Sequence, residues 1–229
     1  MSLQLRCEWG EGAVRSLSAE ADVLVIVDVL SFSTCVDEAV TRGARILPYN
    51  PSAPGAEEFA KKHEAALAVR RGQRRFTLSP AAYLDVEPGT SVVLRSPNGA
   101  LATLTASSGV ILAGCLRNAS AIARAATELG QRILIVPAGE RWPDGSLRPC
   151  LEDWLGAGAI LRQLSGKHSA EARAAIAAFQ ALTPHIPQAI SDSLSGRELI
   201  ERGYAQDVAL AAEVDVSSTV SRFHGEAFI

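Results

Sequence analysis

The sequence predicts an α/β fold made of βαβ units, with a largely parallel sheet and helices on both faces. Strand and helix patterns alternate through the first two-thirds of the chain, which is typical of right-handed crossovers between parallel strands. The clearest strand is an apolar run from Val23 to Leu30, rich in β-branched residues and interrupted only by Asp28. Such a run is typical of a strand that is buried on both faces of a parallel sheet.

The remaining elements follow from the same patterns of apolar spacing and of Gly and Pro breaks. Gly43 and Gly130 each follow a helical pattern directly, which is a normal stop signal for a helix. We expect irregular loops at 70–90 and 137–149, and a terminal strand pair or an extended tail at 214–228. The expected strands are 22–29, 45–49, 65–69, 91–94, 110–113 and 132–136, and the expected helices are 33–43, 54–63, 100–107, 119–129, 150–164, 169–182, 192–203 and 206–213.

The size and composition of the chain predict one sizeable α/β unit. Its 229 residues, 48% of them hydrophobic, are enough to bury a large core. We expect a single unit over 1–229, with two intimate lobes as the alternative arrangement. Those lobes would be about 1–90 with the C-terminal tail, and about 91–213.

Charge and hydrophobicity exclude two classes of partner. The net charge of −3 does not resemble the basic footprint of a nucleic-acid-binding protein. No stretch approaches the ~20 apolar residues needed to span a bilayer, so we expect no membrane partner. The first residues lack the layout of a signal peptide, and the four scattered cysteines are expected to be free thiols, so we expect a cytoplasmic protein.

Arginines cluster in the loop expected at 70–90, at Arg70, Arg71, Arg74 and Arg75. Short basic runs are common on protein surfaces, so the favoured interpretation is a solvated loop. Binding of a polyanion is the alternative.

Asp28 is the first candidate functional residue, because it follows the buried strand and precedes a helical pattern. In open α/β sheets, ligands bind at the carboxyl ends of the strands. An acid at this edge can hold a divalent cation, and the helix that follows can hold an anion through its N-terminus, where Ser31, Ser33 and Thr34 supply hydroxyls. The alternative is that Asp28 only caps the helix.

Three further strand ends carry polar, small or charged residues, at 95–99, 114–120 and 137–140, and the last leads through a loop to Glu152 and Asp153. Arg95 precedes Asn98 and Gly99, and Arg117 precedes Asn118. If the strands are parallel, both arginines face a common cleft with Asp28. Gly99 would then allow a backbone N–H to approach a phosphate, while each Asn either binds the anion or caps the next helix.

Glu152 and Asp153 begin the helix expected at 150–164, after a loop rich in Gly and Pro. Adjacent acids in this position are ligands suited to Mg²⁺, which takes one or two carboxylates and completes its shell with water and phosphate. Asp28 with one of this pair would be sufficient. Acids in a first helical turn are also favoured by the helix dipole alone, and both interpretations stay open.

The ordered set of motifs is similar to one known family. The matching segments are Val27–Thr34, Leu78–Pro80, Ser96–Gly99, Gly114–Ser120, Leu151–Asp153 and Ser195–Leu199, followed by Gly203 and Asp207–Ala209. In order and spacing they resemble the 2-phosphosulfolactate phosphatase family, from about residue 20 to about residue 220.

The resemblance implies an Mg²⁺-dependent enzyme that removes phosphate from 2-phospho-3-sulfolactate on the route to coenzyme M. It makes Asp28, Glu152 and Asp153 candidate metal ligands, and Asn98, Gly99, Asn118 and the strand-end arginines candidate anion contacts. Two departures matter, because the family often has Thr residues where this chain has Ser96 and Pro97, and it usually has Arg where this chain has Ser31. A two-pronged contact to phosphate or sulfonate is lost there, and Arg95 is the candidate replacement.

The working hypothesis is hydrolysis of a phosphomonoester by direct attack of water, with Asp28 and Glu152 or Asp153 holding Mg²⁺. Three alternatives remain: a phosphatase for another small phosphorylated acid, a non-catalytic anion-binding homologue, and a lyase or isomerase of a phospho-acid. The apolar helices expected at 150–182 are either core or a subunit interface, and an interface there would make the chain a homodimer.

Overall fold

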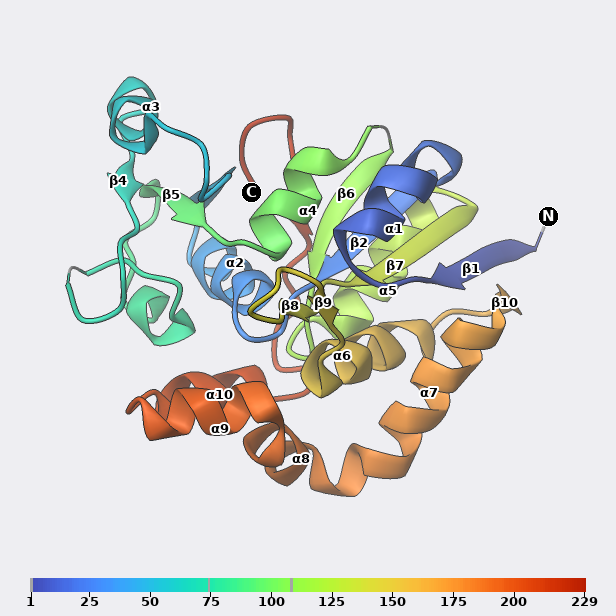
Figure 1. Cartoon of the computed structure of the whole chain (residues 1–229). Helices are drawn as coiled ribbons and strands as arrows, with labels where there is room; N and C mark the ends of the chain where they lie inside the picture. Colours follow the sequence, from blue (N-terminus) through green and yellow to red (C-terminus); the bar gives the residue numbers. More distant parts are fainter. Residues whose placement is uncertain (1, 74, 108) are drawn as a thin grey trace.

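The computed structural model, which describes residues 2–73, 75–107 and 109–229, has an α/β architecture around a largely parallel sheet (Figure 1). Within these ranges six strands pair in the order β10-β1-β7-β2-β6-β11, and only β11 runs antiparallel. The predicted fold class is therefore confirmed. The strands are β1 (Leu3–Cys7), β2 (Val23–Val27), β6 (Val110–Gly114), β7 (Arg132–Pro137), β10 (Gly166–His168) and β11 (Ser221–Arg222).

Strand β2 lies at the middle of this sheet, between β7 and β6, and all five of its residues are buried. Val27, its last residue, pairs with Gly114 of β6 and with Pro137 of β7. The carboxyl ends of these three parallel strands therefore meet at one edge of the sheet. Asp28 directly follows β2 and lies at this edge.

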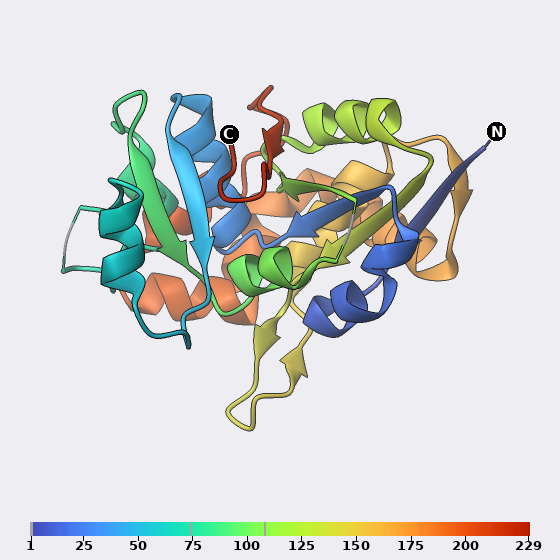
Figure 2. The ribbon, with the colours of Figure 1, turned by 90° about the horizontal axis from the view of Figure 1, so that it is seen from above.

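A second sheet of three parallel strands lies beside the first (Figure 2). It consists of β3 (Arg45–Tyr49), β5 (Ser91–Arg95) and β4 (Ala66–Leu67), in that order. A lobe boundary near residue 90 would separate β5 from its partners β3 and β4. Neither sheet therefore corresponds to one of the suggested lobes. The C-terminal tail links the two sheets, since β11 pairs with β6 and Phe228 forms a bridge with Ile46 of β3.

Helices cover both faces of the larger sheet. Successive residues of β2 point to opposite faces, so its alternate residues pack against two different sets of helices. Val23, Val25 and Val27 pack with α5 (Ala119–Leu129), α6 (Leu151–Leu161) and α7 (Ala170–Leu182). Leu24 and Ile26 pack with α1 (Gly10–Leu17), α2 (Phe32–Thr41) and α4 (Gly99–Thr105). Most of α6 is buried within the chain itself, so it belongs to the core, and the homodimer stays a prediction.

The last helices return to the segment that follows β4. Helix α10 (Ala205–Ala211) contacts the short 3₁₀ turn Pro80–Tyr83, and Figure 1 shows α9 (Leu194–Glu201) and α10 beneath this segment. The loop expected at 137–149 contains an antiparallel hairpin. The remaining elements are α3 (Ala56–Lys62), β8 (Glu140–Arg141), β9 (Leu147–Arg148) and α8 (Ile186–Asp192), with 3₁₀ turns at Ser18–Glu20 and Thr183–His185.

Two expectations about composition can be compared with the structure. All four cysteines are buried and free, as predicted. Across the described part of the chain, every helix is too short or too polar to cross a membrane.

Candidate active site

Asp28 lies immediately after β2, at the point where two strand-to-helix turns meet. Its Oδ1 accepts a hydrogen bond from the backbone N of Phe32 at 3.1 Å, and its Oδ2 accepts one from the backbone N of Gly99 at 2.8 Å. The hydroxyl of Ser96 donates to the same Oδ2 at 3.3 Å. Phe32 is the first residue of α2, so the carboxylate does cap this helix. It also joins α2 to the turn that begins α4, across 71 positions of sequence.

Burial sets the charge state of Asp28. Its side chain is nearly inaccessible to solvent, and the loss of hydration raises its pKa to about 6. Hydrogen bonds from Phe32 and Gly99 oppose this rise in pKa, while the nearby charge of Glu140 adds to it. Asp28 therefore changes its charge close to neutral pH, which is the range in which a catalytic carboxyl is useful.

Asp153, in the first turn of α6, holds two strand ends together next to Asp28. Its Oδ1 accepts from the backbone N of Val29 at 2.7 Å, and its Oδ2 accepts from the backbone N of Gly139 at 2.8 Å. Burial raises its pKa well above the ordinary range, and the charges of Asp28 and Glu152 raise it further. The two acidic segments that the sequence predicted to meet are therefore adjacent.

Glu152 and Glu140 complete the acidic edge. Glu152 is buried, and its Oε2 has no hydrogen-bond partner among the described residues. Glu140 follows β7 and is half-buried, and its Oε1 accepts from the side-chain amide of Asn98 at 2.9 Å. The sequence analysis placed Glu140 at a polar strand end of this edge but did not choose it as a site residue, because a single acid in a charged loop carries no distinguishing signal.

The fit of a magnesium ion depends on which of these oxygens are not already bonded. Asp153 uses both oxygens on backbone N–H groups, whereas Oε2 of Glu152 is unpartnered and Oδ1 of Asp28 accepts one hydrogen bond. Within the described ranges no three His, Cys, Asp or Glu side chains form a group that could hold a metal ion. The donor set therefore fits Mg²⁺ held by one or two carboxylates, which is its usual mode, and does not fit a cation enclosed by three.

Most of the predicted hydroxyl groups shape the turn after β2 rather than face a ligand. Ser33 Oγ donates to the carbonyl of Ile26 at 3.1 Å, and Thr34 Oγ1 donates to the carbonyl of Val29 at 2.7 Å. Ser31 differs from both, because its Oγ accepts a hydrogen bond from Nη2 of Arg71 at 3.1 Å. The positive charge at this position therefore comes from Arg71, rather than from Arg95 as expected.

Gly99 and Asn98 serve the carboxylates, which corrects the expectation that they contact an anion directly. The N–H of Gly99 is used by Asp28. A Cβ at Gly99 would lie 2.4 Å from Cδ1 of Phe32 and 2.8 Å from Oδ2 of Asp28, so this turn requires glycine. The side chain of Asn98 donates to Glu140 and does not cap α4.

Arg117 and Asn118 bond to described residues other than Asp28, which is a second correction. Arg117 is buried and its guanidinium is surrounded by carboxylates, with Nε 3.1 Å from Asp37 and Nη2 2.6 Å from Glu38. Its Nη1 also contacts Glu213. Asn118 does not cap α5; its Oδ1 accepts from the backbone N of Cys115 at 2.9 Å and closes the turn after β6.

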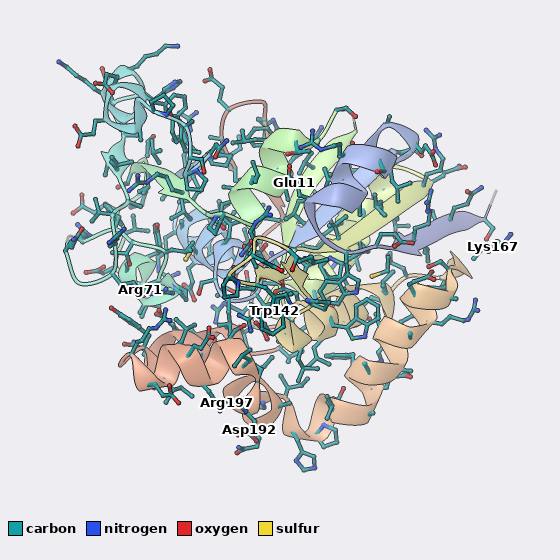
Figure 3. The ribbon with its side chains drawn as sticks, viewed as in Figure 1. Glu11, Arg71, Trp142, Lys167, Asp192 and Arg197 are labelled. Atoms are coloured by element: carbon teal, nitrogen blue, oxygen red, sulfur yellow. The ribbon has the colours of Figure 1, made fainter. Side chains whose placement is uncertain are left out.

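Arg95 lines a cavity of about 540 Å³ together with Arg70, Arg71 and Arg202. Arg71 lies between the segment after β4 and helices α9 and α10 (Figure 3), with its Nε 3.3 Å from Oδ2 of Asp207 and its guanidinium 4.9 Å from the ring centre of Tyr204. The sequence favours a solvated loop for the arginine cluster, and Arg71 departs from this prediction. Its partners Tyr204 and Asp207 are distant in the sequence, so no local pattern indicates the contact. Arg74 lies outside the described residues.

The fold and the site together define an α/β protein in which a buried acidic sheet edge adjoins an arginine-lined cavity. The sequence model of 2-phosphosulpholactate phosphatase matches residues 13–226. The chain therefore belongs to this family, whose members are phosphoric monoester hydrolases.

Named relatives agree with this family. A probable 2-phosphosulfolactate phosphatase of Carboxydothermus hydrogenoformans is 28% identical over 217 residues, covering 90% of this chain and 88% of the relative. The 2-phosphosulfolactate phosphatase of Methanothermobacter thermautotrophicus is 28% identical over 198 residues, covering 86% and 84%. A probable 2-phosphosulfolactate phosphatase of Pseudothermotoga lettingae is 28% identical over 221 residues, covering 92% and 93%.

Proposed function

We propose that this chain hydrolyses the phosphate ester of a small phosphorylated acid, 2-phosphosulfolactate or a close analogue, in an Mg²⁺-dependent reaction. The observation that carries the proposal is the buried Asp28 carboxylate, held at the carboxyl edge of the sheet beside the arginine-lined cavity. The names of the relatives support the substrate class. This chain has Ser31 where the resemblance implies Arg. For this reason the proposed substrates include close analogues of 2-phosphosulfolactate.

The roles of the residues follow from their hydrogen bonds. In this proposal Asp28 and Glu152 hold Mg²⁺, which would neutralise charge on the phosphoryl oxygens when bound. Asp153 positions the ends of β2 and β7 through its two backbone contacts, and so fixes where Asp28 stands. Gly99, Phe32 and Ser96 orient the Asp28 carboxylate by donating to it.

Water, rather than Asp28, is the proposed nucleophile. Both oxygens of Asp28 already accept hydrogen bonds, and those bonds stabilise the anion in place and reduce its reactivity toward phosphorus. Residue 30 is Leu, so the chain also lacks a second Asp two positions after the first. Direct attack by water requires no covalent enzyme intermediate.

The proposal includes a cytoplasmic location. Its support is the four buried thiols, which form no disulfide, as is usual in a reducing compartment.

The test is release of inorganic phosphate from a panel of small phosphorylated acids, with Mg²⁺ and with a chelator. Wild-type protein should release phosphate only with the metal. Asp28→Asn should lower kcat by roughly 10²–10³-fold, because removing one preorganised electrostatic group at a reacting centre has this effect. Asp22→Asn is the matched control, since Asp22 directly precedes β2 as Asp28 directly follows it.

The two variants also separate the reaction from the fold. Asp22→Asn should keep wild-type turnover, and both variants should keep the wild-type circular dichroism spectrum. Near-normal turnover by a folded Asp28→Asn protein would overturn the proposed role of this carboxylate. Conversion of a substrate without phosphate release would instead indicate a lyase or an isomerase.

A further inference from the structure

The arginine-lined cavity has no assigned ligand, although four positive side chains from three segments converge on it. Arg70 and Arg71 follow β4, Arg95 ends β5, and Arg202 follows α9. No described residue that lines the cavity is Asp or Glu. A cavity with this lining is suited to an anion, because each guanidinium offers several N–H donors to its oxygens.

Three of these arginines lack a counter-charge among the described residues. Arg71 pairs with Asp207, but Arg70, Arg95 and Arg202 form no ion pair with any residue that the structure describes. Leu78 and Leu94 supply apolar parts of the lining. The cavity therefore combines uncompensated positive charge with apolar surface, as a site for a small organic acid does.

A hydrogen bond and a chain neighbour link two arginines of the cavity to the acidic edge. Arg71, which lines it, donates to Ser31 in the turn after Asp28. Arg95, which also lines it, precedes Ser96, whose hydroxyl donates to Asp28. A small molecule with its ester at Asp28 could thus place a second charged group in this cavity.

Resting on the proposed function, we propose that the cavity binds the sulfonate of the substrate and selects sulfonated phospho-acids over those that lack this group. A sulfonate presents three oxygens in different directions, which suits donors arriving from three segments. A planar carboxylate is satisfied by one two-pronged arginine and does not require four. Arg70, Arg95 and Arg202 are therefore specificity-determining residues for the non-reacting end of the substrate.

The test compares two substrates that share the same ester. 2-Phosphosulfolactate carries the sulfonate, and 2-phospholactate has a methyl group in place of the sulfomethyl group. Arg202→Met and the double variant Arg70→Met/Arg202→Met should raise KM for the sulfonated substrate by roughly 10–100-fold, the effect of losing charge-assisted hydrogen bonds. Neither variant should change KM for 2-phospholactate, and kcat should stay close to wild type.

Arg45→Met is the matched control. Arg45 is exposed and begins β3. Tyr49, at the other end of β3, pairs with Arg95, so Arg45 lies at the opposite end of the same small sheet from the cavity. This variant should keep wild-type KM for both substrates. An equal rise of KM for both substrates in the Arg202 variants would assign the cavity to the phosphate and overturn the inference.

A binding measurement makes the inference separable from the phosphatase proposal. Sulfolactate, which has the sulfonate and no phosphate, should bind wild-type protein in calorimetry and bind Arg70→Met/Arg202→Met at least ten times more weakly. Such binding without any phosphate release would support the cavity and reject the phosphatase. Unchanged KM in an active double variant, or no binding of sulfolactate to wild-type protein, would reject the cavity assignment.

Discussion

Arg117 and the arginines of the cavity occupy similar places in the sequence but have opposite environments. Arg95 ends β5 three positions before Asn98, and Arg117 follows β6 one position before Asn118. Arg117 is enclosed by Asp37, Glu38 and Glu213, and we call these four residues the paired cluster. Arg70, Arg95 and Arg202, which we call the open group, face a cavity with no acid in its described lining.

The difference shows that the position of an arginine at a strand end does not define its role. The deciding residues lie elsewhere in the chain, since Asp37 and Glu38 come from α2 and Glu213 follows α10. Two adjacent acids in the otherwise uncharged α2 are the signal that could have been used. Acids buried in such a helix need a cationic partner, because an unpaired buried charge is strongly unfavourable.

The largest effect expected from this comparison is on stability. Arg117→Met should lower the free energy of unfolding by about 3–5 kcal/mol, because the buried Asp37 would lose its cationic partner and the buried Glu38 would keep only Arg42. Arg202→Met, in the open group, should stay within about 0.5 kcal/mol of wild type, as surface substitutions usually do. Urea titration measures both values.

The same pair of variants should give the reverse order in activity. Folded Arg117→Met should keep wild-type KM, while Arg202→Met should not. If Arg117→Met proves as stable as wild type but loses substrate affinity, the distinction between the paired cluster and the open group is wrong.

Much of the fold could be predicted because β2 and its neighbours follow simple patterns. The five buried residues of β2 form a continuous apolar run, and the alternation around it correctly indicated parallel strands. Strand β1 was not predicted, because the alternation of Leu3, Leu5 and Cys7 with Gln4 and Arg6 extends over only five residues. Strand β10 was also missed, because it has only three residues and carries Lys167 and His168.

The position of Asp28 could be predicted, but its partners could not. Its place after β2 follows from the end of the apolar run. The contacts with Ser96 and Gly99 depend on β5, which belongs to the other sheet, and no local pattern indicates how two sheets are placed. For the same reason Arg71 was assigned to solvent, because its partner Asp207 is 136 positions away in the sequence.

A smaller effect is expected at Arg71, which links both kinds of environment. It lines the cavity and also pairs with the buried Asp207. Arg71→Met should lower the free energy of unfolding by about 1–3 kcal/mol, the cost of leaving a buried acceptor without its partner, and should raise KM for the sulfonated substrate.

A double variant separates these two consequences. Arg71→Met/Asp207→Asn should recover part of the lost stability, because no buried charge is left unpaired, but it should keep the raised KM. Recovery of KM in the double variant would show that Arg71 acts only by supporting the loop. It would then have to be removed from the residues that contact the substrate.

The smallest effect expected is the pH dependence of the paired cluster. Burial raises the pKa of Asp37 above its ordinary value of 3.8, even though hydrogen bonds from Ser217 and Arg117 oppose the rise. The folded protein therefore holds this proton to a higher pH than the unfolded chain does. As pH increases from about 3.8 through the raised pKa, Asp37 should lower the stability of wild type relative to Asp37→Asn.

Asp22 provides a control of opposite sign. Hydrogen bonds from Arg132 lower its pKa, so its contribution to stability is present above the ordinary value and is lost as pH falls. Unfolding of wild type, Asp37→Asn and Asp22→Asn between pH 3 and 7 should therefore show opposite slopes for the two differences. Equal slopes would mean that burial does not dominate in the paired cluster. Because the open group contains only arginines, which do not titrate in this range, its positive charge should stay constant from pH 3 to 7.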